Sequence, residues 1–285
     1  MAGERVKIGI VAPASRLDPA IAEKLAALAA ARYPDRPPDL VFSPQCFLSA
    51  GHFAGDDDLR ARAFIDMAND PSVDALWFGR GGYGSCRLVE KLPEALQPAA
   101  RRKTYLGYSD AGTLLAALHR QGFPFLAHGP MPSDLRRPGG ETAVARALDF
   151  LVLGADTGLE PSLAPGTAAA AFNLTILCHL LGTPIEPRLD GHVLMIEEVD
   201  EAMYRIDRCL FHLTGNPAIR KVAGIRLGRC APIPDNIPDF GATEEQITRR
   251  WCESSGIPYL GRADIGHDID NKIVPFGGWV TTAFR

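Results

Sequence analysis

The sequence lacks the features that would place the chain in a membrane or on a nucleic acid. No apolar run approaches the roughly 20 residues that a membrane-spanning helix needs, and the run VKIGIVA near the N-terminus is too short for a secretory signal. The 30 basic residues are outnumbered by 34 acidic ones, and no basic block stands out. We therefore expect a cytoplasmic protein with no membrane and no nucleic acid among its partners.

Cysteine and histidine are present without the spacings that usually mark a disulfide framework or a metal site. The six cysteines are scattered and form no CxxC pair, which indicates reduced thiols. The seven histidines do not cluster at the spacing of metal ligands, so we expect no zinc site. An apolar fraction of 46% and a charged fraction of 22% are ordinary for a globular protein.

Strand-like and helix-like segments alternate through the first half of the chain. Apolar runs typical of buried strands occupy residues 6–12, 40–43, 73–79, 104–108 and 123–130. Segments with helical character follow the first four runs, at 18–32, 56–70, 85–92 and 110–122. This alternation predicts right-handed βαβ units and a parallel sheet with helices on both faces.

The alternation stops between residues 154 and 172, where the chain is rich in Gly, Pro and Ala and has no clear period. We interpret this stretch as a connection between two domains, residues 1–153 and 173–285. After it, helices are predicted at 173–182, 202–215 and 243–256, and strands at 192–199, 222–228 and 258–266. The predicted fold class is α/β, with an N-terminal doubly wound parallel-sheet domain and a smaller C-terminal α/β domain.

The segment GYSDAG, residues 107–112, lies between a predicted strand and a predicted helix. Ser109 has Gly107 two residues before it and small residues after it, as the crowded backbone of a nucleophile elbow requires. The free N–H groups at the start of the following helix suit a developing oxyanion. A serine that only caps that helix fits the segment equally well.

The segment FGRGGYGSCR, residues 78–87, contains Gly79, Gly81, Gly82 and Gly84 at the end of a predicted strand. Its spacing is GxGGxG rather than the GxGxxG of dinucleotide folds, so phosphate binding is poorly supported. Glycine also lets a backbone N–H approach a substrate oxygen closely, and it permits a tight turn between strand and helix. From the residues alone, the tight turn is the favoured interpretation.

Taken in order along the chain, these segments resemble the LD-carboxypeptidases, a family of serine peptidases that trim murein peptides. The resemblance extends from about residue 6 to residue 278. It rests on the combination of RGGYG (80–84), GYSD (107–110), HGPM (128–131), YRIDR (204–208) and GH (266–267). The family includes the microcin C self-immunity peptidases, so the resemblance implies a mechanism rather than one substrate. It implies no cofactor and no metal.

The resemblance implies a catalytic triad of serine, histidine and glutamate. Ser109 in GYSD matches the nucleophile, His267 in GHDIDN matches the base, and Glu197 at the end of LMIE matches the orienting carboxylate. These roles are chemically consistent, since histidine accepts and returns a proton near neutral pH and a carboxylate fixes its tautomer. The implied oxyanion hole consists of the backbone N–H groups of Gly82 and Asp110, in a cleft between the domains.

Several of these assignments have rivals in the sequence itself. Glu198 and Glu201 lie within one turn of chain from Glu197, and either could be the orienting carboxylate. We expect His128 to serve packing or turn bonding, and Asp110 to cap the helix that follows it.

The resemblance implies a homodimer that acts on a murein peptide in peptidoglycan recycling. The bond cut joins an L-centre, of diaminopimelate or lysine, to the terminal D-alanine of a tetrapeptide. One alternative is a microcin C-type immunity peptidase acting on aminoacyl-sulfamoyl adenylates, for which Trp251 and Trp279 are candidate stacking residues. The other is a two-domain binding protein without catalysis, in which Ser109 only caps a helix.

Overall fold

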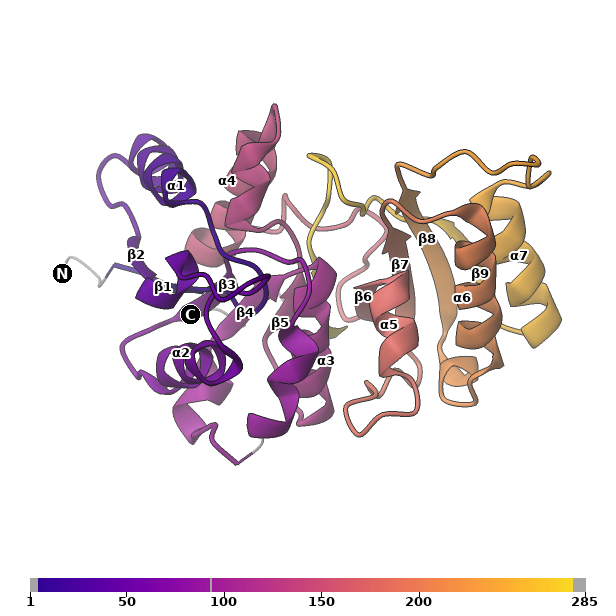
Figure 1. Ribbon diagram of the computed structural model, residues 1–285, viewed down its shortest axis with the longest axis horizontal. Helices are drawn as coiled ribbons and strands as arrows, with labels where there is room; N and C mark the ends of the chain where they lie inside the picture. Colours follow the sequence, from indigo (N-terminus) through magenta and orange to yellow (C-terminus); the bar gives the residue numbers. More distant parts are fainter. Residues whose placement is uncertain (1–4, 93, 279–285) are drawn as a thin grey trace.

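Two β-sheets lie side by side in the computed structural model, which describes residues 5–92 and 94–278 (Figure 1). The first sheet has six strands in the order β10-β5-β4-β3-β1-β2, and the second has five in the order β11-β6-β7-β8-β9. Helices pack against both sheets. The predicted α/β fold with two units is therefore confirmed.

The first sheet is built from the N-terminal half of the chain. Its parallel strands are β1 (Lys7–Val11), β2 (Asp39–Phe42), β3 (Ala75–Phe78), β4 (Thr104–Gly107) and β5 (Leu126–His128). A C-terminal strand, β10 (Val274–Pro275), pairs antiparallel with β5 and places Val274 opposite His128. At β10 the chain thus returns to the N-terminal sheet, beside the strand that follows α3.

Helices cover both faces of this sheet, as its continuous apolar strands predict. The helices α1 (Pro19–Arg32) and α4 (Gly140–Leu153) lie on one face, and α2 (Asp57–Asn69) and α3 (Gly112–Arg120) lie on the other (Figure 1). Neighbouring residues of β3 point into different layers. Trp77 belongs to a buried cluster with Leu25 and Leu148, whereas Phe78 belongs to another and stacks on Phe64.

The second sheet has its helices on one face. Its strands are β6 (Ala168–Asn173), β7 (Val193–Glu198), β8 (Gly224–Cys230), β9 (Tyr259–Arg262) and β11 (Gly277–Gly278), of which only β11 is antiparallel to its neighbour. The helices are α5 (Leu174–Leu180), α6 (Met203–Gly215) and α7 (Glu244–Ser255). On the other face, Ala169 and Met195 pack against Ile265 and Val274 from the segment after β9.

One hydrophobic core joins the two units. Leu114 and Leu115 of α3 belong to the same buried cluster as Phe172 and Leu177 of the second unit. A methyl group on Gly112 would lie 3.5 Å from the Phe172 ring, an ordinary contact distance. The helix that begins beside Ser109 therefore packs directly against the second unit, and this contact fixes the two sheets relative to each other.

The predicted helix over residues 85–92 is wrong. That segment forms only two 3₁₀ turns, η2 (Ser85–Arg87) and η3 (Val89–Lys91). The segment starts without a side-chain cap, because its N-cap residue is Gly84, and it is followed in the sequence by Pro93, which lacks the N–H that a continuing helix needs. The other 3₁₀ helices are η1 (Pro44–Phe47), η4 (Pro98–Arg102), η5 (Ser109–Ala111), η6 (Pro132–Arg136) and η7 (Ile219–Lys221).

Two further elements differ from the sequence-based expectation. Strand β6 begins inside the predicted connection 154–172, because its alanines pack in the cluster with Met195, and this burial overrides the low strand propensity of alanine. Helix α4 has no predicted counterpart, although its buried Val144, Leu148 and Leu151 recur at helical spacing. The division of the chain into domains at 153 and 173 stays a prediction.

Candidate active site

Ser109 occupies a strained turn at the carboxyl end of β4. Its φ angle is +60°, in the left-handed region that non-glycine residues rarely adopt. Ser109 is the first residue of the turn η5, which leads into α3, while Tyr108 and Ala111 hold the cap positions of η5 and α3. The interpretation of Ser109 as a helix cap is therefore wrong. The backbone has the geometry of a nucleophile elbow.

Two glycines make room for this turn. A methyl group on Gly107 would lie 2.6 Å from the Phe78 ring, which is too close for any side chain. A methyl group on Gly81 would lie 3.0 Å from Cβ of Ser109 and 3.1 Å from its hydroxyl oxygen. The glycine-rich loop after β3 therefore passes directly against the side chain of Ser109.

Gly82 holds a backbone conformation that is open only to glycine. Its φ angle is +113°, and a methyl group there would collide with the hydroxyl of Ser15. Gly82 is exposed, and no acceptor for its backbone N–H lies within the described residues. This N–H is available to a ligand beside Ser109.

Asp110 connects the elbow to the glycine-rich loop. Its buried carboxylate accepts a hydrogen bond of 2.9 Å from the backbone N–H of Ser85, at the end of that loop. The expectation that Asp110 caps its own helix is wrong, because its side chain caps neither η5 nor α3. Burial raises the pKa of Asp110, and the hydrogen bonds from Ser85 and Gly84 oppose this rise.

Glu197 and His267 form a buried pair. Glu197 is the penultimate residue of β7, fully buried, at a register shift between β7 and β8. Its carboxylate hydrogen-bonds Nδ1 of His267, whose side chain is 7% exposed. A carboxylate only accepts, so Nδ1 carries the proton and Nε2 is left as the basic nitrogen. Nε2 is buried and has no partner within the described residues.

The pKa of His267 is set by two opposing effects. Burial by itself lowers the pKa, because it disfavours the imidazolium. The negative charge of Glu197 and its hydrogen bond outweigh burial, so the pKa of His267 lies above its ordinary value. The pair therefore stabilises the protonated form that a general base reaches during catalysis.

The two rival carboxylates are engaged elsewhere. Glu198 accepts hydrogen bonds from the Asn173 side chain and from the backbone N–H and hydroxyl of Thr175, at the start of α5. Glu201 forms an ion pair of 2.5 Å with Arg205 on α6. Of the three candidates, Glu197 is the one in contact with His267.

Tyr108 lies between two histidines. Its ring centre is 4.8 Å from that of His267 and 5.6 Å from that of His128. Its hydroxyl donates a hydrogen bond of 2.8 Å to Asp134, and Arg137 lies 3.3 Å from the same carboxylate. Tyr108, Asp134 and Arg137 were not predicted as site residues. The only sequence signal was the position of Tyr108 next to Ser109.

His128 packs beneath the site, as expected. It is 1% exposed, and its Nε2 lies 3.4 Å from the side-chain oxygen of Asn271. Burial lowers the pKa of His128 to about 4, so the ring is neutral at physiological pH. Asn271 also accepts a hydrogen bond from the backbone N–H of Gly266, so it fixes the residue directly before His267.

The loop that carries His267 is held from both units of the molecule. Arg229, at the end of β8, pairs with Asp264 and Asp268 on either side of His267. Arg146 of α4 donates hydrogen bonds to the backbone carbonyls of Ile269 and Asn271. These contacts position a side chain that lies outside any helix or strand.

Ser109, the glycine-rich loop and Glu197 all lie at carboxyl ends of parallel strands, where α/β proteins bind ligands. The antiparallel strand β10 begins beside the carboxyl end of β5, so the His267 loop enters at the same edge. Within the described residues, no hydrogen bond joins Ser109 to His267. Catalytic hydrogen bonds are often long in unliganded enzymes and shorten when substrate binds.

The described residues contain no group of His, Cys, Asp or Glu arranged to hold a metal ion. All six cysteines are free thiols, which confirms that prediction. None of the described helices is long and apolar enough to cross a membrane.

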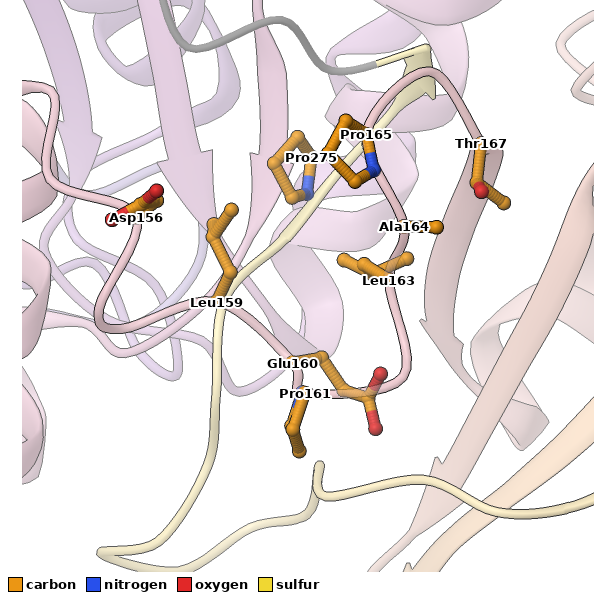
Figure 2. A pocket seen from close by; sticks show the side chains of 9 residues that line it. All are labelled: Asp156, Leu159, Glu160, Pro161, Leu163, Ala164, Pro165, Thr167 and Pro275. Atoms are coloured by element: carbon orange, nitrogen blue, oxygen red, sulfur yellow. The ribbon is translucent and has the colours of Figure 1, made fainter.

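A cavity of about 270 Å³ is lined by residues of the segment 156–167, which joins the two sheets, and by Pro275 (Figure 2). Ser109 is not among its lining residues. Leu159, Leu163 and Pro275 give it an apolar lining. Glu160 at its edge already accepts hydrogen bonds from Ser162 and from the backbone N–H of Asp264. No residue of the elbow, of the glycine-rich loop or of the His267 loop lines this cavity.

Comparisons with known proteins cover most of the chain. Residues 8–129 match the model of the LD-carboxypeptidase N-terminal domain, and residues 169–282 match that of the LD-carboxypeptidase C-terminal domain. A putative carboxypeptidase of Synechocystis is 33% identical, covering 84% of this chain and 79% of the relative. The murein tetrapeptide carboxypeptidase of Pseudomonas aeruginosa is 27% identical, and the match covers 79% of this chain and 78% of the relative.

Solved structures share the fold. The muramoyltetrapeptide carboxypeptidase of Oxalobacter formigenes superposes with a TM-score of 0.76 at 22% identity, covering 94% of this chain and 93% of that one. A microcin C7 self-immunity protein, in complex with aspartyl sulfamoyl adenosine, superposes with a TM-score of 0.78 at 17% identity, covering 96% and 92%. At these identities the likeness shows the fold alone.

Proposed function

The chain belongs to the LD-carboxypeptidase family, and from that premise we propose that it is a serine carboxypeptidase with Ser109, His267 and Glu197 as its triad. The proposed reaction removes the terminal D-alanine of a murein tetrapeptide by hydrolysing the bond after the L-centre of the diamino acid. The observation that carries this proposal is the buried Glu197–His267 pair, whose imidazole contacts Tyr108, the residue directly before a serine in a strained, left-handed turn.

In the first proposed step, Nε2 of His267 takes the proton of the Ser109 hydroxyl while the oxygen attacks the scissile carbonyl. Serine is a weak nucleophile at neutral pH, so this general base is needed. The resulting imidazolium is stabilised by the Glu197 carboxylate, which also keeps the ring in the tautomer with a free Nε2. His267 then donates its proton to the amine of D-alanine as the bond breaks.

The oxygen of the scissile carbonyl gains negative charge in this step. We propose that the backbone N–H groups of Gly82 and Asp110 donate hydrogen bonds to it. Gly82 supports this role because its positive φ and the neighbouring Ser15 leave no room for a side chain, and its N–H has no acceptor within the described residues. Asp110 N–H lies at the start of the helical segment that leads into α3, where the helix dipole favours negative charge.

Water completes the proposed cycle. His267 takes a proton from a water molecule, and the hydroxide attacks the acyl group on Ser109. The bond to Ser109 breaks, and the proton returns from His267 to the serine oxygen. The products are D-alanine and the shortened peptide, and the reaction needs no external oxidant or reductant.

The murein substrate is favoured over a microcin-type substrate by the sequence relatives. The relative from Bacillus subtilis, named a probable murein peptide carboxypeptidase, is 30% identical over 80% of this chain. The microcin self-immunity neighbours share only the fold. Trp251, one candidate for stacking on an adenine, packs against Phe211 and donates its indole N–H to Asp207 of α6. Trp279 lies outside the described residues.

A cytoplasmic homodimer remains a prediction from the resemblance.

Mass spectrometry of the protein with a disaccharide-free murein tetrapeptide tests the proposal. We expect loss of one alanine with the natural chain and none with Ser109→Ala, whose alanine occupies the same turn. Equal turnover by both proteins would exclude Ser109 as the nucleophile. If the tetrapeptide survives but a serine-directed phosphonate labels Ser109, the substrate is wrong and an aminoacyl-sulfamoyl adenylate is tested next. If neither reaction occurs, a two-domain binding protein without catalysis is supported, although Ser109 is not a helix cap in it.

A further inference from the structure

Three arginines lie close together near Ser109 without a carboxylate partner. They are Arg16, in the loop after β1; Arg80, in the glycine-rich loop after β3; and Arg136, at the end of η6 after β5. We call them the arginine cluster. Within the described residues none of them forms an ion pair, whereas the nearby Arg137 pairs with Asp134.

Backbone hydrogen bonds hold the three loops together around Arg80. The N–H of Ser133 donates to the carbonyl of Gly79 at 3.0 Å, and the N–H of Ser15 donates to the carbonyl of Gly81 at 3.4 Å. The guanidinium of Arg80 donates to the carbonyl of Arg16 at 2.9 Å. Contacts within the folded protein therefore hold the three arginine-bearing loops next to one another.

No ion pair neutralises the charge of the cluster within residues 5–92 and 94–278. Arg80 is half-buried, and burial lowers its pKa; the like charges of Arg136 and Arg16 lower it further. Arg16 and Arg136 are exposed, so an anion from solvent can reach the cluster. Concentrated positive charge with no internal counterion attracts a negatively charged ligand.

The cluster also includes a residue of the loop that contacts Ser109. Arg80 directly precedes Gly81, at which a methyl group would lie 3.1 Å from the hydroxyl oxygen of Ser109. It comes two residues before Gly82, whose N–H we assign to the oxyanion hole. All three arginines follow carboxyl ends of strands in the sheet that carries Ser109. Ser109 and the arginine loops therefore lie at the same end of the parallel strands.

We propose that the arginine cluster binds the free C-terminal carboxylate of the peptide substrate, on the leaving-group side of Ser109. This inference rests on the proposed carboxypeptidase function. In a carboxypeptidase the terminal carboxylate lies one residue beyond the scissile carbonyl, and successive Cα atoms are about 3.8 Å apart. Guanidinium groups match carboxylates in geometry and keep their charge. The cluster thus explains how the enzyme selects a chain end over an internal peptide bond.

The arginine cluster could instead bind another carboxylate of the peptide. Two ligands distinguish these two possibilities. One is the murein tetrapeptide with a free terminal carboxylate, and the other is the same peptide with a terminal carboxamide. Only the first carries a negative charge on the leaving residue, while both keep every other acidic group. We compare kcat/KM for each with the natural chain and with Arg16→Ala, Arg80→Lys and Arg136→Ala.

We expect the natural chain to prefer the free acid by about 10- to 100-fold, the range for a hydrogen-bonded charge pair. Each variant should lower kcat/KM for the free acid and leave the amide nearly unchanged. Arg16→Ala is the cleanest variant, because no hydrogen bond of its side chain occurs within the described residues. Arg36→Ala, at an exposed position before β2 on the opposite edge of the sheet, is the matched control and should change neither value.

Binding by the Ser109→Ala protein, measured by calorimetry, separates failure of this proposal from failure of the proposed function. Suppose that the natural chain releases no alanine while Ser109→Ala binds the acid more tightly than the amide. If adding Arg16→Ala or Arg136→Ala to Ser109→Ala then abolishes this preference, the anion site is supported without the reaction. If every variant changes affinity and kcat/KM equally for the acid and the amide, the cluster does not bind the terminal carboxylate and the proposal is overturned. Circular dichroism of each variant checks that it is folded.

Discussion

The carboxylate of Glu197 contacts Nδ1 of His267 although the two residues are 70 positions apart in the chain. One lies at the end of β7 and the other in the loop after β9, so neither strand alone could orient the imidazole. Strand β8 separates these two strands in the sheet, and its Arg229 holds the acidic residues that flank His267. The proposed base is thus paired with a carboxylate of the second unit and presented to a serine of the first.

Replacement of Glu197 by glutamine keeps a hydrogen-bond acceptor but removes the negative charge. We expect kcat/KM to fall by about 10²- to 10⁴-fold, because the imidazolium formed during catalysis loses its counterion. The matched control is Glu201→Gln, which removes a partly exposed ion pair with Arg205 and should leave kcat/KM within about twofold. Equal losses in both variants would assign the effect to the β7–α6 segment rather than to the pair.

The pH dependence of kcat/KM should report the raised pKa of His267. The base must be neutral to accept a proton, so activity falls as pH decreases through this pKa, and the midpoint lies above the ordinary value of about 6.5. In Glu197→Gln, burial acts without the opposing carboxylate, so the midpoint should move to lower pH. A pH–rate profile of both proteins measures this, and an unchanged midpoint would contradict the assignment of His267 as the titrating base.

Gly82→Ala tests the proposed oxyanion hole. We expect a loss of about 1–3 kcal/mol in the free energy of unfolding and at least about a 10²-fold loss of kcat, since the methyl would collide with Ser15 and displace the N–H. Gly122→Ala is the control, because Gly122 also has a positive φ of 73° but no atom within 4 Å of the added methyl. It should lose about 1 kcal/mol of stability and no activity.

His128 should make the protein sensitive to acid. Its folded pKa of about 4 lies below its unfolded value of about 6.5, so the stability that its neutral form provides is complete above pH 6.5 and is lost as pH falls towards 4. The loss amounts to at most about 3 kcal/mol. His128→Gln should narrow the difference in melting temperature between pH 7.5 and pH 4.5, and His52→Gln, in an exposed loop, should not. An unchanged difference in His128→Gln would show that other groups control acid unfolding.

The raised pKa of His267 acts on stability in the opposite direction. Its contribution is complete below the unfolded pKa and is lost as pH rises through the higher folded pKa. The two histidines therefore have to be varied separately, since a double variant would hide both effects.

Local patterns in the sequence determined most of the fold. The apolar runs at β1, β3 and β4 and the helical spacing of α1 and α6 were enough to predict these elements, because each buries a face whose period its own residues define. The motifs around Ser109, Glu197 and His267 likewise predicted the candidate site through their family resemblance.

Only the tertiary structure decided how these pieces meet. Strand β10 exists because β5 offers a free edge, and β6 forms from alanines because Met195 and Ile265 bury them. The choice of Glu197 over Glu198 and Glu201 depends on contacts between segments far apart in the chain. So does the grouping of three arginines that form no ion pair within the described residues. Local propensity carries no information about such contacts, whereas burial and charge in the folded protein determine them.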